Sequence, residues 1–229
     1  MWRSHMVIGA SSWLAAQTLA GPLTGAALDT RERACGAVIA AGGALLCDMD
    51  TPNSRLSNAL GPLTRTAARV IGRVFGGHRR GTHSLIFCAA VGALSLATLA
   101  RGELVPVSAR WTLTVGELAA LAIAYGAASL SVACLLRLRG TRAAVVATLL
   151  VAGVASTTPP AALVSAAVTI GCASHLLADV LTPEGIQPLW PFSRRRVSLR
   201  VIRRTGDRRE TLLVFAMALV TVAIVGGYA

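Results

Sequence analysis

Four histidines and three aspartates are the residues of this chain whose types and spacing could do chemistry. His175 and Asp179 are four positions apart, so on a helix their side chains project from the same face. Asp48 and Asp50 directly follow an apolar run, where a chain reversal would bring both carboxylates to one recess. Imidazole and carboxylate together are a usual ligand set for zinc, and they also suit manganese. The candidate ligands are His5, Asp48, Asp50, His78, His83, His175 and Asp179.

Each of these signals is weak by itself. A histidine and an aspartate four apart are more often a local hydrogen-bonded pair, and two aspartates two apart are common at helix ends and turns. The stretch 78–84 could be a loop in which Thr82 or Ser84 caps the next helix. Four imidazoles and three carboxylates together, however, exceed the needs of one mononuclear site. We therefore expect a divalent metal, zinc or alternatively manganese, bound as one or two ions.

The elements that must position these residues are indicated by the composition. Of the 229 residues, 54% are hydrophobic and 14% are charged, whereas a soluble domain has roughly 25% charged residues. The positive charge consists of 22 arginines without a lysine, and the net charge is +12. These values exclude a disordered chain and disfavour a soluble enzyme. They indicate a membrane protein whose arginines set its topology and face anionic lipid.

Apolar runs long enough, or nearly long enough, to cross a hydrocarbon core of ~30 Å as helices recur along the chain. They predict an all-α polytopic membrane bundle of about seven transmembrane helices, forming one domain over residues 1–229. The expected spans are 6–28, 34–47, 84–100, 112–136, 143–159, 161–181 and 211–229. The second run is short for a span, and its glycines and alanines suit close contact between helices.

The arginines also predict the orientation of the bundle. With the N-terminus in the cytoplasm, 18 arginines fall in inside segments and four in outside segments, as the positive-inside rule requires. All four histidines and the three candidate aspartates then lie at the cytoplasmic face. An alternative for the first run is a cleavable signal peptide, which would remove His5.

Two loops carry concentrated positive charge. Arg65, Arg69 and Arg73 are at helical spacing beside apolar residues, which predicts a basic interfacial helix around 60–76; a solvated charged face is the alternative. Residues 194–210 form a second basic run, interpreted as a topology anchor or a contact with anionic lipid, with nucleic acid disfavoured as a partner. The cysteines lack paired spacing and are interpreted as small apolar residues: Cys35, Cys47, Cys88, Cys134 and Cys172.

Three stretches carry a family resemblance: CDMDTPNSRLS at 47–57, GHRRGTHSL at 77–85 and SHLLADVLTPEGIQPLWPF at 174–192. In order and approximate spacing, and with a histidine near the N-terminus, they resemble a bacterial inner-membrane family of predicted metal-dependent hydrolases. That family is also described as LexA-binding and inner-membrane-associated. The chain departs from the family pattern at Cys47, where the family has proline, at Thr51, where it has histidine, and at Arg80, where it has glycine.

The resemblance implies an inner-membrane hydrolase distantly similar to the zinc-dependent phospholipase C and P1 nuclease group, with the seven residues above as metal ligands. On this interpretation Asp50 doubles as general base, and Arg79 and Arg80 bind a substrate phosphate through forked N–H donors. Topogenic charge is the alternative for both arginines. Thr82, Ser84 and Glu184 are candidates for orienting the ligands, and a solvated acid is the alternative for Glu184. Membrane lipids and a phosphorylated amphiphile are the expected partners.

Two other classes of function remain open from the sequence. A metal-ion transporter or sensor would place its acids and histidines in the middle of several spans, whereas here no acid lies in the middle of a predicted span except Glu117, which is near the start of its span. A regulatory membrane protein would bind a cytoplasmic protein partner through its basic loops, and it would not need the histidines and aspartates together.

Overall fold

The computed structural model describes residues 2–24, 28–52, 54, 57, 62–108, 111–119, 161–204 and 206–226, with a few isolated positions between 122 and 149. These residues are mainly helical. The long helices are α1 (Trp2–Thr24), α2 (Thr30–Leu46), α4 (Leu85–Leu99), α7 (Ala161–Val180) and α8 (Arg208–Gly226). The shorter elements are α3 (Pro62–Val74), the single turns η1 (Cys47–Asp50) and η3 (Gly81–His83), and the strands β1 (Leu104–Ser108) and β2 (Trp111–Thr114).

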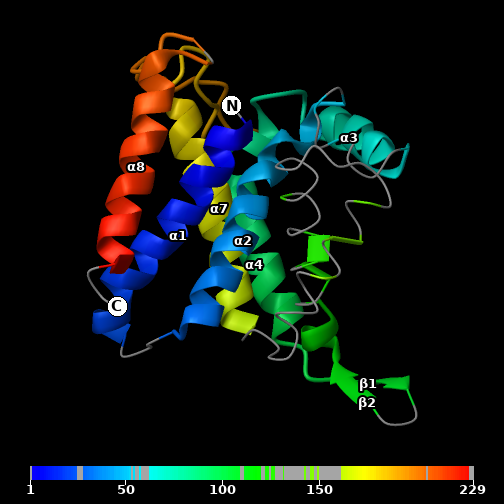
Figure 1. Cartoon of the computed structure of the whole chain (residues 1–229). Helices are drawn as coiled ribbons and strands as arrows, with labels where there is room; N and C mark the ends of the chain where they lie inside the picture. The colour runs from blue at the N-terminus through cyan, green and yellow to red at the C-terminus, as the bar shows by residue number, and fades with distance from the viewer. Residues whose placement is uncertain are drawn as a thin grey trace.

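The long helices pack side by side as a bundle (Figure 1), with α1, α2 and α7 packed against one another, α4 against α7, and α8 against α1. Trp13 of α1 fills the core with Ile39 of α2 and Val164 of α7, and its indole Nε1 donates to the Arg33 carbonyl at 3.0 Å. Such an apolar core with few polar atoms follows from the apolar runs of the sequence.

Glycine lets the backbones of α1, α2 and α7 approach closely. A Cβ on Gly171 of α7 would lie 2.2 Å from the carbonyl oxygen of Ala40 in α2, and a Cβ on Gly9 of α1 would lie 2.7 Å from the same oxygen. Neither position can hold a larger residue without separating the helices. Small residues at helix contacts are the usual means of packing helices tightly in membranes.

Five of the predicted apolar runs coincide with α1, α2, α4, α7 and α8, and the predicted basic helix coincides with α3. Arg65, Arg69 and Arg73 are exposed on α3, and Ala68 is buried beneath them. Among the described residues, Ala162–Val180 is the helix long and apolar enough to cross a membrane, and Leu85–Thr98 is a shorter apolar helix. The count of seven spans therefore stays a prediction, and most of 112–136 and all of 143–159 that could test it lie outside the described ranges.

The expectation of an all-α chain is wrong at residues 104–114. There β1 and β2 pair antiparallel, with Leu104 opposite Thr114 and Val105 opposite Leu113. β-Branched residues are dense in this stretch and favour extended backbone, and Pro106 cannot continue a helix. The predicted span beginning at 112 thus starts in a strand, and the Glu117 carboxylate accepts from the Thr114 backbone N–H at 2.7 Å where the next helical residues begin.

The cysteines match their interpretation as small apolar residues where the structure describes them. Cys35, Cys47, Cys88 and Cys172 are buried free thiols, and Cys134 lies outside the described residues. Cys47, Cys88 and Cys172 pack with Leu176 and Ile186 in one apolar cluster.

Candidate metal centre

All seven predicted ligands lie at one end of the bundle. α1 begins there with His5, and α7 ends there with His175 and Asp179 (Figure 1). The η1 turn, which ends α2, carries Asp48 and Asp50. His78 lies in the turn after α3 and His83 in η3, directly before α4. Residues up to 174 positions apart in the chain, Asp179 and His5, are thereby brought to one place.

The innermost group consists of His83, His175 and Asp179, all of them buried. Nε2 of His83 and Nε2 of His175 are 3.2 Å apart, and Oδ2 of Asp179 lies 3.4 Å from the first and 3.5 Å from the second. Ligand atoms bound to a tetrahedral zinc at 2.0–2.1 Å are about 3.3 Å from one another. The three atoms therefore have the mutual spacing of zinc ligands.

Asp48 and His5 extend this group. Oδ1 of Asp48 faces both histidines, 3.8 Å from Nε2 of His83 and 3.9 Å from Nε2 of His175. The ring of His5 stacks on that of His175 with centroids 3.9 Å apart, and its Nε2 is 3.6 Å from Oδ1 of Asp179. Three overlapping groups could hold a metal ion: His83 with His175 and Asp179, His5 with Asp48 and His175, and Asp48 with His78 and His83.

Asp179 has the polar environment expected of an ion ligand. Its side chain is 1% exposed, and neither carboxylate oxygen has a hydrogen-bond partner. The Arg79 guanidinium lies 3.2 Å from Oδ1 and compensates part of the charge. A buried carboxylate that lacks hydrogen bonds is costly. A bound cation would remove that cost, so the donor set fits a divalent metal.

Asp50, in contrast, is fully engaged by protein donors. Its Oδ2 accepts from the Thr82 hydroxyl at 2.6 Å, and its Oδ1 lies 2.8 Å from Nδ1 of His78. The Thr82 hydroxyl is also 3.0 Å from Nδ1 of His83. A carboxylate behind the outer nitrogen of a ligand histidine fixes the ring orientation in many metal sites. The geometry therefore favours a positioning role for Asp50 and Thr82, and Asp50 belongs to none of the three groups found among the described residues.

The electrostatics of η1 and the following turn keep both aspartates ionised. Burial alone would raise the pKa of Asp50, but hydrogen bonds from His78, His83 and Thr82 outweigh it and hold the pKa below its ordinary value. Burial opposes ionisation of Asp48 too, and the nearby imidazoles of His83, His175 and His5 lower its pKa. Burial would lower the pKa of His78, but its contact with Asp50 raises it. Ionised carboxylates are the form that binds metal.

Thr51 is a site residue that the sequence interpretation left without a role. Its hydroxyl donates to Oδ1 of Asp50 at 3.0 Å and lies 2.9 Å from Nδ1 of His78. It therefore links the η1 turn to the turn that carries His78. The signal that could have found it is its position between the two aspartates and the proline of the first motif.

The two adjacent arginines point to different places. Arg79 has a φ of 61°, a left-handed conformation that is uncommon for a residue with a side chain. Its Nη1 donates to the Thr182 hydroxyl at 2.8 Å and lies 3.8 Å from Oε2 of Glu184, which supports Arg79 against Asp179. Arg80 is exposed. Arg80 rather than Arg79 is thus accessible to a phosphate.

Ser84 does not contact the cluster as expected of an orienting residue. Its hydroxyl accepts from the Phe87 backbone N–H at 3.0 Å and donates to the Gly81 carbonyl at 2.7 Å. Ser84 is therefore the N-cap of α4, the alternative that the sequence had left open. It acts on His83 only through the shape of η3.

The chain matches the family described as YdjM inner membrane protein over residues 1–229. Because the match covers the whole chain, the protein belongs to this family and is an inner membrane protein. No curated protein and no solved structure matches it.

Proposed function

We propose that this inner membrane protein is a metal-dependent hydrolase of phosphoesters, with the buried histidines and aspartates holding zinc, or alternatively manganese, as one or two ions. The observation that carries the proposal is the innermost group. His83, His175 and Asp179 place three buried ligand atoms 3.2 to 3.5 Å apart, and the carboxylate lacks hydrogen bonds. A purely structural cluster would be expected to satisfy that carboxylate.

A divalent ion at this position supplies Lewis acidity, which activates water near neutral pH and polarises a phosphoryl oxygen. The chain supplies the rest. His83, His175 and Asp179 hold the ion, with Asp48 and His5 at its edge, and Thr82 and Asp50 keep the His83 ring in place. The base is predicted to be the pair of Asp50 and His78. The Asp50 carboxylate holds the His78 ring by its contact with Nδ1, and Nε2 of His78 accepts the proton from the attacking water.

Arg80 is the proposed contact for the substrate phosphate, because it is exposed and directly follows Arg79, which contacts Asp179. Arg79 instead positions Asp179. The side chain of Asp48 is 23% exposed and that of His78 is 43% exposed, whereas His83, His175 and Asp179 are buried. The water and the phosphate are therefore expected to approach from the side of Asp48 and His78.

The proposed topology is multi-pass, with the N-terminus and the cluster at the cytoplasmic face. The distribution of arginines supports it, since His5, η1 and the basic 194–210 run all belong to the same end of the bundle. A substrate in the inner leaflet would then reach the site from the cytoplasmic side.

The test uses the full chain purified in detergent, with metal content measured by atomic emission and hydrolysis followed with a chromogenic phosphodiester. The variants are His83→Ala and His175→Ala, and the control is Leu96→Ala, an exposed position of α4 away from the cluster. We expect both histidine variants to lose bound metal and hydrolysis, and the control to keep both. Wild-type metal content in both histidine variants would overturn the metal site, and metal binding without hydrolysis would overturn the enzyme.

A further inference from the structure

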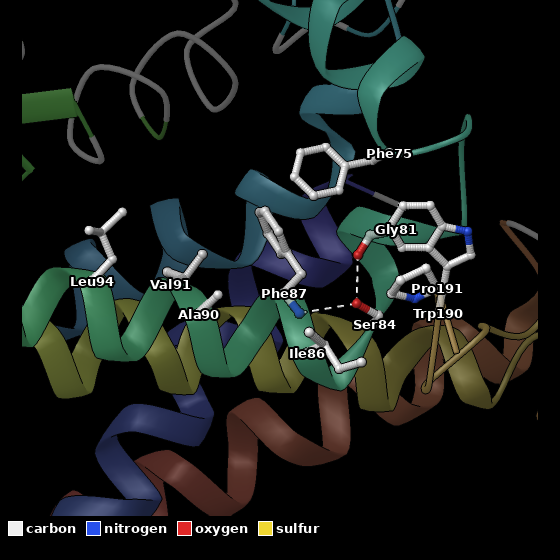
Figure 2. Close-up of a pocket in the computed structure, with 10 residues that line it drawn as sticks. All are labelled: Phe75, Gly81, Ser84, Ile86, Phe87, Ala90, Val91, Leu94, Trp190 and Pro191. Atoms are coloured by element: carbon white, nitrogen blue, oxygen red, sulfur yellow. Dashed lines mark hydrogen bonds between the residues drawn. The ribbon is translucent and has the colours of Figure 1, made fainter. Parts of the chain in front are cut away.

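An apolar groove runs from η3 along α4 (Figure 2). Its volume is about 280 Å³, and no charged side chain lines it. Figure 2 shows Leu94, Val91, Ala90 and Phe87 arranged along α4, with Phe75 and Trp190 over the N-terminal end of that helix. The groove is thus a track that begins at the aromatic side chains and continues along α4.

The groove and the metal cluster share one piece of backbone. Gly81 lines the groove and is the first residue of η3, while Thr82 and His83, the next two residues, face the cluster. A Cβ on Gly81 would lie 2.6 Å from the Phe75 ring and 2.9 Å from the Trp190 ring, so glycine is needed there. A molecule in the groove would therefore contact the backbone turn that carries His83.

The length of the groove matches one membrane leaflet. From Ser84 to Leu94 the lining extends over ten residues of α4, or about 15 Å at 1.5 Å per residue. This is half of a hydrocarbon core of ~30 Å, which is the depth that a lipid acyl chain occupies.

The positive charge near Phe75 and Trp190, at one end of the groove, favours a lipid with an anionic headgroup. Arg80 is exposed there, and its Cδ and the Trp190 ring both lie within 3.6 Å of the position of a Cβ on Gly76. Within the described part of the chain the Arg80 guanidinium has no hydrogen bond or ion pair. Arg73 is exposed near the end of α3, two residues before Phe75. A guanidinium at the end of an apolar track complements an anionic phosphate attached to an acyl chain.

We infer that this groove seats one acyl chain of an anionic membrane phospholipid, with its phosphate on Arg80, which directly precedes the η3 turn that carries His83. As the site of a substrate, the inference rests on the proposed function, and it makes that substrate a phospholipid of the inner leaflet. As a lipid-binding groove, it can be tested separately.

The experiment reconstitutes the full chain in phosphatidylcholine vesicles that contain a small fraction of phosphatidic acid with brominated chains. Bromine quenches nearby tryptophan fluorescence, and Trp190 lies in the groove. Comparison with the Trp190→Phe variant gives the part of the quenched fluorescence that comes from Trp190. The reference is an equal fraction of brominated phosphatidylcholine. We expect phosphatidic acid to quench Trp190 more strongly, and Arg80→Gln to weaken this preference about tenfold, the value of one charge-assisted hydrogen bond.

Ala90→Phe fills the groove, and Leu96→Phe adds the same ring to an exposed position of α4 that does not line it. We expect the first variant to abolish the preference and the second to keep it. Equal quenching by the two lipids, or an unchanged preference in Ala90→Phe, would overturn the inference. Dissociation of a dimer by Ala90→Phe, without lipid preference in wild type, would instead assign the groove to a second copy of the chain.

Hydrolysis of a soluble phosphodiester separates this inference from the proposed function. Ala90→Phe should leave metal content and soluble hydrolysis unchanged while it abolishes cleavage of phosphatidylglycerol, an anionic phospholipid that contains a phosphodiester bond. Lipid preference without any hydrolysis would overturn the enzyme and the substrate assignment, and it would support the lipid groove alone.

Discussion

The ionisable residues at the two ends of the bundle differ in their exposure to solvent. At the end with β1 and β2, Arg101 and Glu103 pair at 3.5 Å with 63% and 64% of their side chains exposed. At the other end, His83, His175 and Asp179 are buried, and the carboxylate has no hydrogen bond. An exposed pair contributes ~0–1 kcal/mol and needs no explanation, whereas a buried carboxylate that has an ion pair with Arg79 but no hydrogen bond is retained at a cost. Burial without satisfaction, rather than charge itself, distinguishes the candidate site.

The largest expected difference between the ends is in metal affinity. Asp179→Asn should weaken zinc binding by more than about 100-fold, because loss of a ligand exceeds the 10–100-fold effect of its supporting residues. Glu103→Gln makes the same chemical change at the other end and should leave affinity unchanged. Competition with a chromogenic chelator measures both. Equal affinities in the two variants would remove the contrast on which the metal site is based.

A smaller effect is expected from the residues behind His83. Asp50→Asn and Thr82→Val should each weaken zinc binding about 10–100-fold, since they fix the ring without touching the ion. The same chelator competition applies. A loss as large as that of Asp179→Asn would make Asp50 a ligand, as the sequence had suggested, whereas no loss would contradict its positioning role.

Metal retention should depend on pH at the cluster end. The pKa values of Asp48 and Asp50 are lowered, so both carboxylates stay ionised well below neutral pH. Protonation of the ligand histidines should therefore be what releases the metal as the pH falls, because only the unprotonated imidazole binds metal. Metal content after dialysis over a pH series measures this. A metal content that does not fall at any acidic pH at which the chain stays folded would contradict histidine ligation.

The smallest contrast concerns helix caps at the two ends. Asp29 caps α2 at the hairpin end in a capping box with Glu32, and Ser84 caps α4 beside the cluster. Asp29→Ala and Ser84→Ala should each lower the free energy of unfolding by about 1 kcal/mol. Only Ser84→Ala is expected to weaken zinc binding as well, because it loosens η3. Thermal unfolding with and without zinc separates the two effects, and equal zinc stabilisation in both variants would contradict this.

Much of this arrangement was accessible from the sequence, for physical reasons. Apolar runs gave the five long helices because burial of apolar side chains dominates their formation. A topology based on arginines alone predicted that His5, Asp48, His83, His175 and Asp179 share one end of the bundle. The short distances among them show that they lie together, while the topology itself stays a prediction. The spacing of Arg65, Arg69 and Arg73 likewise indicated α3.

Other features depend on tertiary contacts that no local pattern contains. Whether Asp50 meets an ion or a hydroxyl depends on where η3 places Thr82, and the different directions of Arg79 and Arg80 depend on one positive φ. β1 and β2 were missed because residues 112–114, which belong to β2, were assigned to the span predicted over 112–136. The groove was invisible because Phe75, Gly81 and Trp190 meet only in the folded chain.

The close contact of Gly171 with Ala40 sets the spacing of α2 and α7, the helices that lead to the candidate metal site. Gly171 is one helical turn before His175, and Ala40 lies in the helix that leads to Asp48. A single methyl group at 171 would collide with the Ala40 carbonyl at 2.2 Å and force the two helices apart. Metal–ligand distances can deviate by only about 0.2 Å. A change in the spacing of these two helices would therefore displace the ligands by enough to weaken metal binding. Gly171 thus helps to set the distances among the metal ligands, although it is not a ligand itself.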